Sequence, residues 1–114
     1  MTTTALFRQL HDRLAGSGVE LSTVFGDEAL TLQGKVVAVL LDHSVAFRLG
    51  RGTDEEARAF DVPGAAPFDP TRKGRPFRGW VCVPDTATDT WPGFAEEAIS
   101  FVGRTVLAGD GGKA

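Results

Sequence analysis

Cysteine is scarce in this sequence: Cys82 is the only one among 114 residues. A single cysteine cannot form a disulfide within the chain, and such a composition is typical of proteins that fold in a reducing compartment. Long hydrophobic runs are also missing. The longest aliphatic run, residues 36–41, is far shorter than the roughly 20 residues of a membrane-spanning helix. The N-terminus lacks the pattern of a secretory signal. We therefore expect a cytoplasmic protein without a membrane partner.

The chain also lacks an excess of positive charge. It has 12 Lys and Arg residues against 15 Asp and Glu residues, which gives a net charge of −3 at pH 7. Domains that bind nucleic acid or anionic membranes over a broad surface are usually strongly basic. Any role in binding nucleic acid must therefore depend on a local cluster of cations.

Motifs for metal binding, nucleophilic catalysis and phosphate binding are absent from the sequence. The two histidines and Cys82 do not follow any metal-ligand spacing. The glycines at positions 50 and 52 do not form a phosphate-binding motif, and three carboxylates follow them, which would repel a phosphate. We expect a protein that is not an enzyme and that has no catalytic residues, no metal and no cofactor.

Hydrophobic periodicity predicts the first half of the fold. Leu6, Leu10 and Leu14 form one stripe at helical spacing, and Thr3 or Thr4 is positioned to cap this helix. Four β-rich runs follow, and short turns separate them. The predicted strands span residues 19–25, 29–32, 35–41 and 45–49, with Gln33-Gly34 as a two-residue turn.

The second half of the chain adds a helix, a strand and a longer helix. Thr53 and Glu56 form a capping box that opens a helix ending near Phe60. A proline-containing loop leads to a strand over residues 77–83, and a helix with a wide apolar face follows over residues 91–106, with Thr90 positioned to cap it.

This grouping predicts an α+β two-layer sandwich in the order α-β-β-β-β-α-β-α, with helices on one face of a five-stranded antiparallel sheet. We expect one domain over residues 1–106 and a flexible C-terminal tail over residues 107–114.

The sheet face away from the helices is predicted to be partly apolar. In the last strand, Val81 and Val83 point one way with Phe77, whereas Trp80 and Cys82 point the other way with Arg78. A partner subunit, a ligand or the proline-rich loop that carries Phe68 has to cover this face. If it is uncovered, it is an interaction site, so Trp80, Arg78 and Cys82 are the candidate interaction residues.

Residues 72–84 read RKGRPFRGWVCVP and contain a cluster of cations: Arg72, Lys73, Arg75 and Arg78. These cations are suited to contact phosphates while a neighbouring aromatic ring stacks on a base. Alternatively, the charges only keep an exposed sheet edge from pairing with other chains. Nucleic-acid surfaces usually draw cations from several elements, and no second run exists in the sequence. This favours the second interpretation.

The order of several short motifs resembles the N-terminal domain of the TfoX/Sxy family, bacterial regulators of natural competence. The matching motifs are Phe25-Gly26, Leu30-Thr31-Leu32, Gly34-Lys35, Phe47-x-Leu49, Pro67-Phe68, Gly74-Arg75-Pro76, Gly79-Trp80-Val81 and Val83-Pro84. The resemblance spans residues 5–106. It departs from the family at Val24 and Asp27, where a methionine and a glycine are common.

The resemblance implies a two-layer α+β fold of the secretion-chaperone-like type and a role for Gly74-Arg75-Pro76 in a tight entry to the last strand. It supplies no catalytic residues. Full-length regulators carry a second helical domain, for which these 114 residues leave no room, so a stand-alone N-terminal-like domain is expected.

The leading functional hypothesis is a cytoplasmic, non-enzymatic interaction or regulatory module that binds a protein partner or a second copy of itself. The first alternative is a nucleic-acid-binding accessory protein that uses the cations of residues 72–78. The second alternative is a module that binds a small ligand between the sheet and the proline-rich loop.

Overall fold

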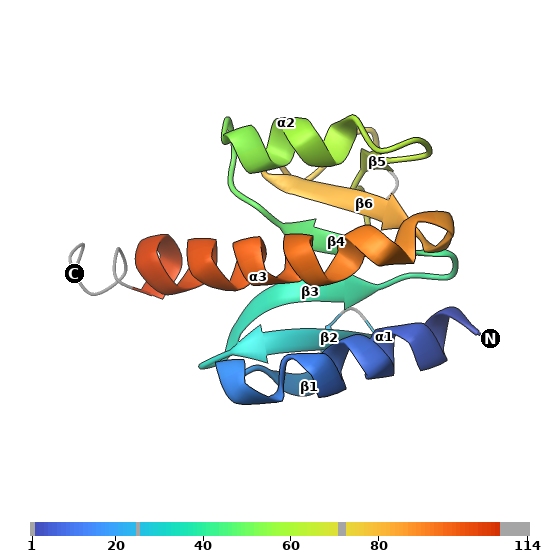
Figure 1. Cartoon of the computed structure of the whole chain (residues 1–114). Helices are drawn as coiled ribbons and strands as arrows, with labels where there is room; N and C mark the ends of the chain where they lie inside the picture. Colours follow the sequence, from blue (N-terminus) through green and yellow to red (C-terminus); the bar gives the residue numbers. More distant parts are fainter. Residues whose placement is uncertain (1, 25, 71–72, 108–114) are drawn as a thin grey trace.

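A single antiparallel sheet organises the computed structural model, which describes residues 2–24, 26–70 and 73–107 (Figure 1). The strand order is β1-β2-β3-β4-β6-β5. The strands are β1 (Glu20–Val24), β2 (Asp27–Leu32), β3 (Lys35–Leu40), β4 (Ser44–Arg48), β5 (Ala66–Pro67) and β6 (Trp80–Pro84). The helices are α1 (Thr3–Arg13), α2 (Asp54–Phe60) and α3 (Trp91–Phe101). Short 3₁₀ turns span Ala15–Ser17 and Asp85–Thr90, and α3 continues as a π-helical turn over Val102–Leu107.

The predicted α+β class and the antiparallel sheet are confirmed, but the sheet has six strands and not five. The sequence did not reveal β5, because two residues cannot show an alternating pattern. β5 pairs with β6 through Ala66 opposite Cys82 and Pro67 opposite Val81. Pro67 is tolerated there because β5 is an edge strand. No helix in the described part of the chain is long and apolar enough to cross a membrane.

Each predicted strand differs from the observed strand at one or both ends, and the caps predicted for α1 and α3 also differ. Thr2 rather than Thr3 or Thr4 caps α1, since its hydroxyl oxygen accepts a hydrogen bond from the Ala5 amide at 3.0 Å. Thr90 occupies the N-cap position of α3, but its side chain makes no capping hydrogen bond, because its hydroxyl donates to the Ala87 carbonyl oxygen at 2.7 Å. The last strand begins at Trp80 rather than at Phe77. The predicted flexible tail lies almost entirely outside the described residues.

The main core lies between the sheet and the helices, as predicted. Figure 1 shows α1 and α3 crossing one face, with α2 beside them near β6. The buried core residues include Phe7, Leu10 and Leu14 of α1, Ala59 of α2, Trp91, Ala95 and Ala98 of α3, and Leu30, Val45, Phe47, Val81 and Val83 of the sheet. The indole N–H of Trp91 donates to the Val83 carbonyl oxygen at 3.3 Å, so this buried ring leaves no polar atom unsatisfied.

The opposite face of the sheet carries a second, smaller core. Phe68, which is only 2% exposed, packs there against Ala29, Val39, Ala46 and Cys82. Of the three possible covers, the proline-rich loop is therefore the one that shields the middle of this face. Because Cys82 is buried under this loop, it does not belong to an exposed interaction face.

The backbone at Gly79 passes very close to the loop between β4 and α2. Its φ angle is +87°, and a Cβ atom there would lie 2.8 Å from the Arg51 amide nitrogen and 3.1 Å from the Gly50 carbonyl carbon. No other residue fits this position without moving a backbone segment. At Gly74, by contrast, a Cβ atom would meet nothing within 4 Å. The tight entry to β6 therefore lies at Gly79 and not at Gly74.

We predict that Gly79→Ala lowers the free energy of unfolding by about 3 kcal/mol, because backbone strain and a steric clash act together. Gly74→Ala is the matched control. Its φ angle is also positive, at +73°, but its surroundings are open, so a loss of about 1 kcal/mol is expected. Urea unfolding followed by circular dichroism measures both. Equal losses would contradict the close approach at Gly79.

Candidate functional site

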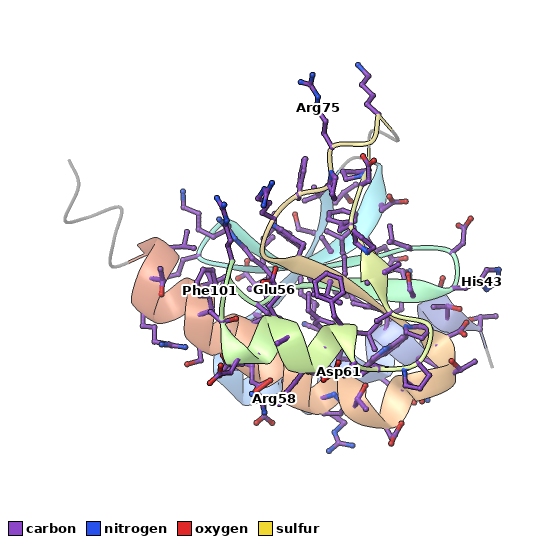
Figure 2. The ribbon with its side chains drawn as sticks, turned by 90° about the horizontal axis from the view of Figure 1, so that it is seen from above. His43, Glu56, Arg58, Asp61, Arg75 and Phe101 are labelled. Carbon is purple, nitrogen blue, oxygen red and sulfur yellow. The ribbon has the colours of Figure 1, made fainter. Side chains whose placement is uncertain are left out.

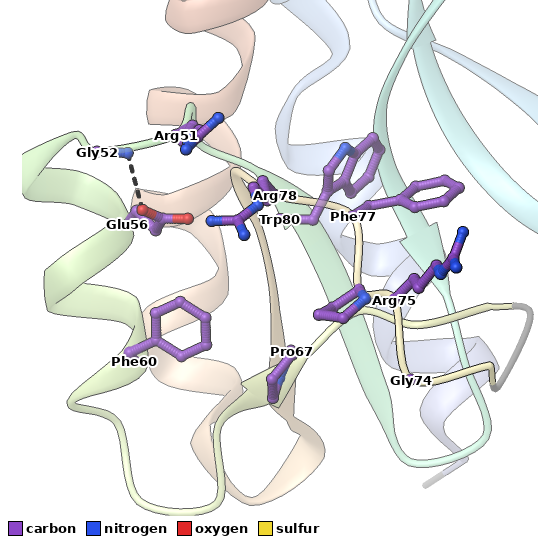
Figure 3. A pocket seen from close by; sticks show the side chains of 11 residues that line it. Arg51, Gly52, Glu56, Phe60, Pro67, Gly74, Arg75, Phe77, Arg78 and Trp80 are labelled. Carbon is purple, nitrogen blue, oxygen red and sulfur yellow. Dashed lines mark hydrogen bonds between the residues drawn. The ribbon is translucent and has the colours of Figure 1, made fainter.

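A pocket of about 740 Å³ opens beside the start of β6 (Figure 3). It forms there because β5 ends opposite Val81, so no described strand pairs with Trp80 on the side away from β4. We call it the cation–aromatic pocket. Its lining residues are Arg51, Gly52, Glu56, Phe60, Pro67, Gly74, Arg75, Pro76, Phe77, Arg78 and Trp80.

Three arginines from two separate segments line this pocket. Arg75 and Arg78 come from the loop before β6, and Arg51 comes from the loop between β4 and α2. All three are exposed, and within the described residues none of the three guanidinium groups forms a salt bridge or a side-chain hydrogen bond. Guanidinium groups without a protein partner are available to an anionic ligand, and their planar shape matches a phosphate or a carboxylate.

Three aromatic side chains share the pocket with these arginines. The described part of the chain has three exposed large hydrophobic side chains, and two of them, Phe60 at 41% and Phe77 at 38%, line this pocket. The third ring of the pocket, Trp80, is half-buried. Exposed rings beside unpaired cations are suited to a ligand that has a planar group next to a negative charge.

The buried ring of Phe68 holds two of these aromatic side chains in place. Its centroid lies 5.7 Å from that of Phe77, edge to face, and 5.3 Å from that of Trp80. The Phe77 amide also donates to the Phe68 carbonyl oxygen at 2.8 Å, which closes the loop at its base. On the sheet, the guanidinium carbon of Arg48 lies 5.9 Å from the centre of the Trp80 ring, within the range of a cation–π interaction.

Glu56 supplies the single carboxylate in the pocket lining. One of its oxygens accepts a hydrogen bond from the Gly52 amide at 2.9 Å, drawn dashed in Figure 3, and the other accepts from the Gly79 amide at 3.1 Å. The predicted capping box is thus modified, since Glu56 reaches Gly52 rather than the amide of the capping residue Thr53. Glu56 thus links the backbone at Gly52 to the backbone at Gly79. Since three arginines and one carboxylate line the pocket, its net charge is positive.

Some carboxylates of the helical layer and of β2 pair with cations away from the pocket. Arg8 of α1 pairs with Glu28 at 2.8 Å, and the pKa of Arg8 is raised by this hydrogen bond and charge. Arg58 of α2 lies 2.7 Å from Glu97 and 3.5 Å from Glu55. In Figure 2, Arg58 and Arg75 lie on opposite sides of the molecule. The net charge of −3 therefore does not describe the surface around the pocket.

The structure brings together only part of the predicted site. Arg75, Arg78 and Trp80 line the pocket, whereas Lys73 is exposed on the same loop outside the lining. Arg72 lies outside the described residues. The sequence analysis missed Arg51, since it is far from the cation cluster along the chain. Its position between two glycines showed a turn but not the direction of that turn.

Cys82 shows no arrangement for catalysis. Burial raises the pKa of its thiol from the ordinary 9.0 to about 11, although a hydrogen bond with Ser44 acts in the opposite direction. A thiolate nucleophile needs a lowered pKa. The side chain of His43 is 89% exposed and lies 3.6 Å from Asp85, as a surface contact. The described residues contain no group of three or more potential metal ligands.

Comparisons with known proteins identify no relative. No family model matches the chain, and no curated protein or solved structure matches it either. Functional inference therefore depends on the residues and geometry of the pocket.

We predict that part of the stability conferred by buried Cys82 is lost in alkali. The pKa is raised in the folded state, so the unfolded chain loses its thiol proton first as the pH rises above about 9. The contribution is fully present below that pH and declines as the pH approaches 11. Urea unfolding of the wild type and of Cys82→Ala, at neutral pH and across this range, tests the prediction. The stability advantage of the wild type should shrink with pH, and parallel curves would contradict it.

Proposed function

We propose that the protein is a non-enzymatic binding module whose cation–aromatic pocket binds a phosphate-bearing ligand with a planar ring, which is the chemistry of a nucleotide unit. The observation that supports this most strongly is the convergence of Arg51 with Arg75 and Arg78 around exposed aromatic rings. If these cations only kept a sheet edge from pairing with other chains, there would be no reason for arginines from separate segments to converge.

The size and composition of the pocket agree with this proposal. Ligand pockets typically measure about 300 to 1,000 Å³ and combine apolar walls with a few polar groups, and a volume of 740 Å³ lies within this range. Arginine forms paired, charge-assisted hydrogen bonds with phosphate oxygens. An aromatic ring adds about 1 to 3 kcal/mol when a base stacks on it. Packing of Phe77 and Trp80 on Phe68 reduces the entropy that the rings lose on binding.

Interaction with a protein, the leading hypothesis from the sequence, remains the second candidate. Phe68 covers the middle of the apolar face, so this candidate depends on another surface. β1 is an edge strand, no other described strand pairs with its outer side, and its Leu21 is 44% exposed. An open strand edge of this kind is a template for pairing with another chain, including a second copy.

We also propose that the chain is a cytoplasmic relative of the TfoX/Sxy N-terminal domain. The observed α+β fold is compatible with that family. The resemblance implied a tight entry to the last strand at Gly74-Arg75-Pro76, whereas the close backbone approach lies at Gly79. A single buried thiol agrees with a reducing compartment.

The proposed pocket function predicts that thymidine monophosphate binds, and that Arg78→Ala weakens the binding about tenfold, which corresponds to about 1.4 kcal/mol. Arg13→Ala, an exposed cation at the end of α1, is the control and should have no effect. NMR titration at low salt measures both. Pyrophosphate and thymidine, each with half of the recognised chemistry, should bind more weakly than the nucleotide. Absence of binding, or an equal loss in the control, would refute the proposal.

The second candidate predicts a reversible dimer in sedimentation velocity experiments. Leu21→Lys should shift it toward the monomer without loss of folding, because Leu21 is already exposed. A monomer at every concentration would remove this candidate and would leave the pocket proposal untouched.

A further inference from the structure

Glu56 lines the cation–aromatic pocket but pairs with none of the arginines there. Within the described residues it forms no salt bridge. Its two oxygens instead accept one hydrogen bond each, from the backbone amides of Gly52 and Gly79, at 2.9 and 3.1 Å. A carboxylate oxygen can accept two hydrogen bonds. Each oxygen of Glu56 therefore keeps one acceptor position, while the two backbone bonds fix the direction in which the carboxylate points.

Phe60 lies beside Glu56 on the same face of α2. The two residues are four positions apart, which makes them neighbours on a helix surface. Figure 3 shows both side chains at the pocket, with Phe77 and Trp80 on its other side. Those two rings pack on Phe68. Phe60 is 41% exposed and contacts no other aromatic ring in the described part of the chain, so it offers the most open stacking surface in the pocket.

A planar ring stacked on Phe60 presents its edge to the carboxylate of Glu56. The two oxygens of a carboxylate match two adjacent N–H donors, just as they match the fork of an arginine side chain. Among the common bases, guanine alone carries two such donors side by side, at N1 and at the 2-amino group. Thymine offers one N–H between two carbonyl groups, and adenine and cytosine place a ring-nitrogen acceptor beside their amino group.

From this match we propose that the pocket selects a guanine nucleotide, with the base on Phe60 and its N1–H and 2-amino N–H donating to Glu56. The inference rests on the proposed function and deepens it by naming the base. Arg51, Arg75 and Arg78 bind the phosphate, which every nucleotide has. Glu56 is the specificity-determining residue, because it distinguishes one base from another.

The first test varies the ligand and leaves the protein unchanged. Guanosine, inosine and adenosine monophosphates are titrated into the full chain and followed by NMR at one low salt concentration. Inosine monophosphate lacks only the 2-amino group, so it should bind about tenfold more weakly than guanosine monophosphate, as expected for one hydrogen bond to a charged group. Adenosine monophosphate has neither donor and turns an acceptor toward Glu56, so a loss of about a hundredfold is expected.

The second test removes the carboxylate. Glu56→Gln replaces one acceptor oxygen by an amide group, and it should reduce the preference for guanosine over adenosine monophosphate at least tenfold. Binding of adenosine monophosphate should be retained, whereas a pocket damaged by the lost backbone bond would bind both nucleotides more weakly. Glu55→Gln is the matched control, since it makes the same change on α2 outside the pocket lining and should leave the preference as it is.

The third test examines the stacking surface. Phe60→Ala should weaken binding of guanosine monophosphate about tenfold, because it removes the ring under the base. Folding should tolerate the change, since Phe60 is exposed. An unchanged affinity would overturn the placement of the base on Phe60.

The outcomes separate this inference from the proposed function. Equal affinity for the three purine nucleotides, or an unaltered preference in Glu56→Gln, would overturn the inference while the proposed function stands. Binding of no nucleotide would remove both. A free nucleotide and a guanine within single-stranded RNA share the recognised chemistry, and the trinucleotide UpGpU distinguishes them. Tighter binding than that of guanosine monophosphate would assign the pocket to RNA, and weaker binding would assign it to the free nucleotide.

Discussion

The peptide groups on both sides of Gly79 hold the two segments of the candidate site together. Its amide donates to the carboxylate of Glu56, and its carbonyl oxygen accepts from the amides of Leu49 and Gly50 at 2.8 and 3.0 Å. These bonds fasten the entry of β6 to the loop between β4 and α2, which a side chain at position 79 would push away. Without this close approach, Arg51 would not lie in the same pocket as the arginines before β6.

Phe68 connects the stability of the fold with the order of the candidate site. It is buried on the face of the sheet that the helices leave free, where it packs on Val39 and Cys82. The same ring supports Phe77 and Trp80 from below. One residue thus shields a second small core and presents two aromatic side chains at the surface in fixed positions, which lowers the entropic cost of binding a planar group.

Charge is distributed unevenly over an acidic chain. Carboxylates of the helical layer and of β2 are matched by Arg8 and Arg58, whereas the cations around Trp80 have few carboxylates near them. Exposed charges separated by more than about 8 Å are largely screened at physiological ionic strength. A ligand near Trp80 therefore responds mainly to the local arginines. Net charge is a useful guide only when the cations are spread evenly.

The sequence by itself determined the class of the fold and the order of the main elements, because periodicity, caps and turn residues act over a few positions. It placed Val81 and Val83 on the correct face, but Phe77, predicted to point with them, packs against Phe68 on the opposite face. Gln33-Gly34, with φ angles of +50° and +81°, forms the predicted hairpin turn. Tertiary structure alone decided that Phe68 covers the second face, that Cys82 is buried and that Arg51 joins Arg75 and Arg78. These contacts join residues distant in sequence, and they depend on the path of irregular loops, which no local periodicity encodes.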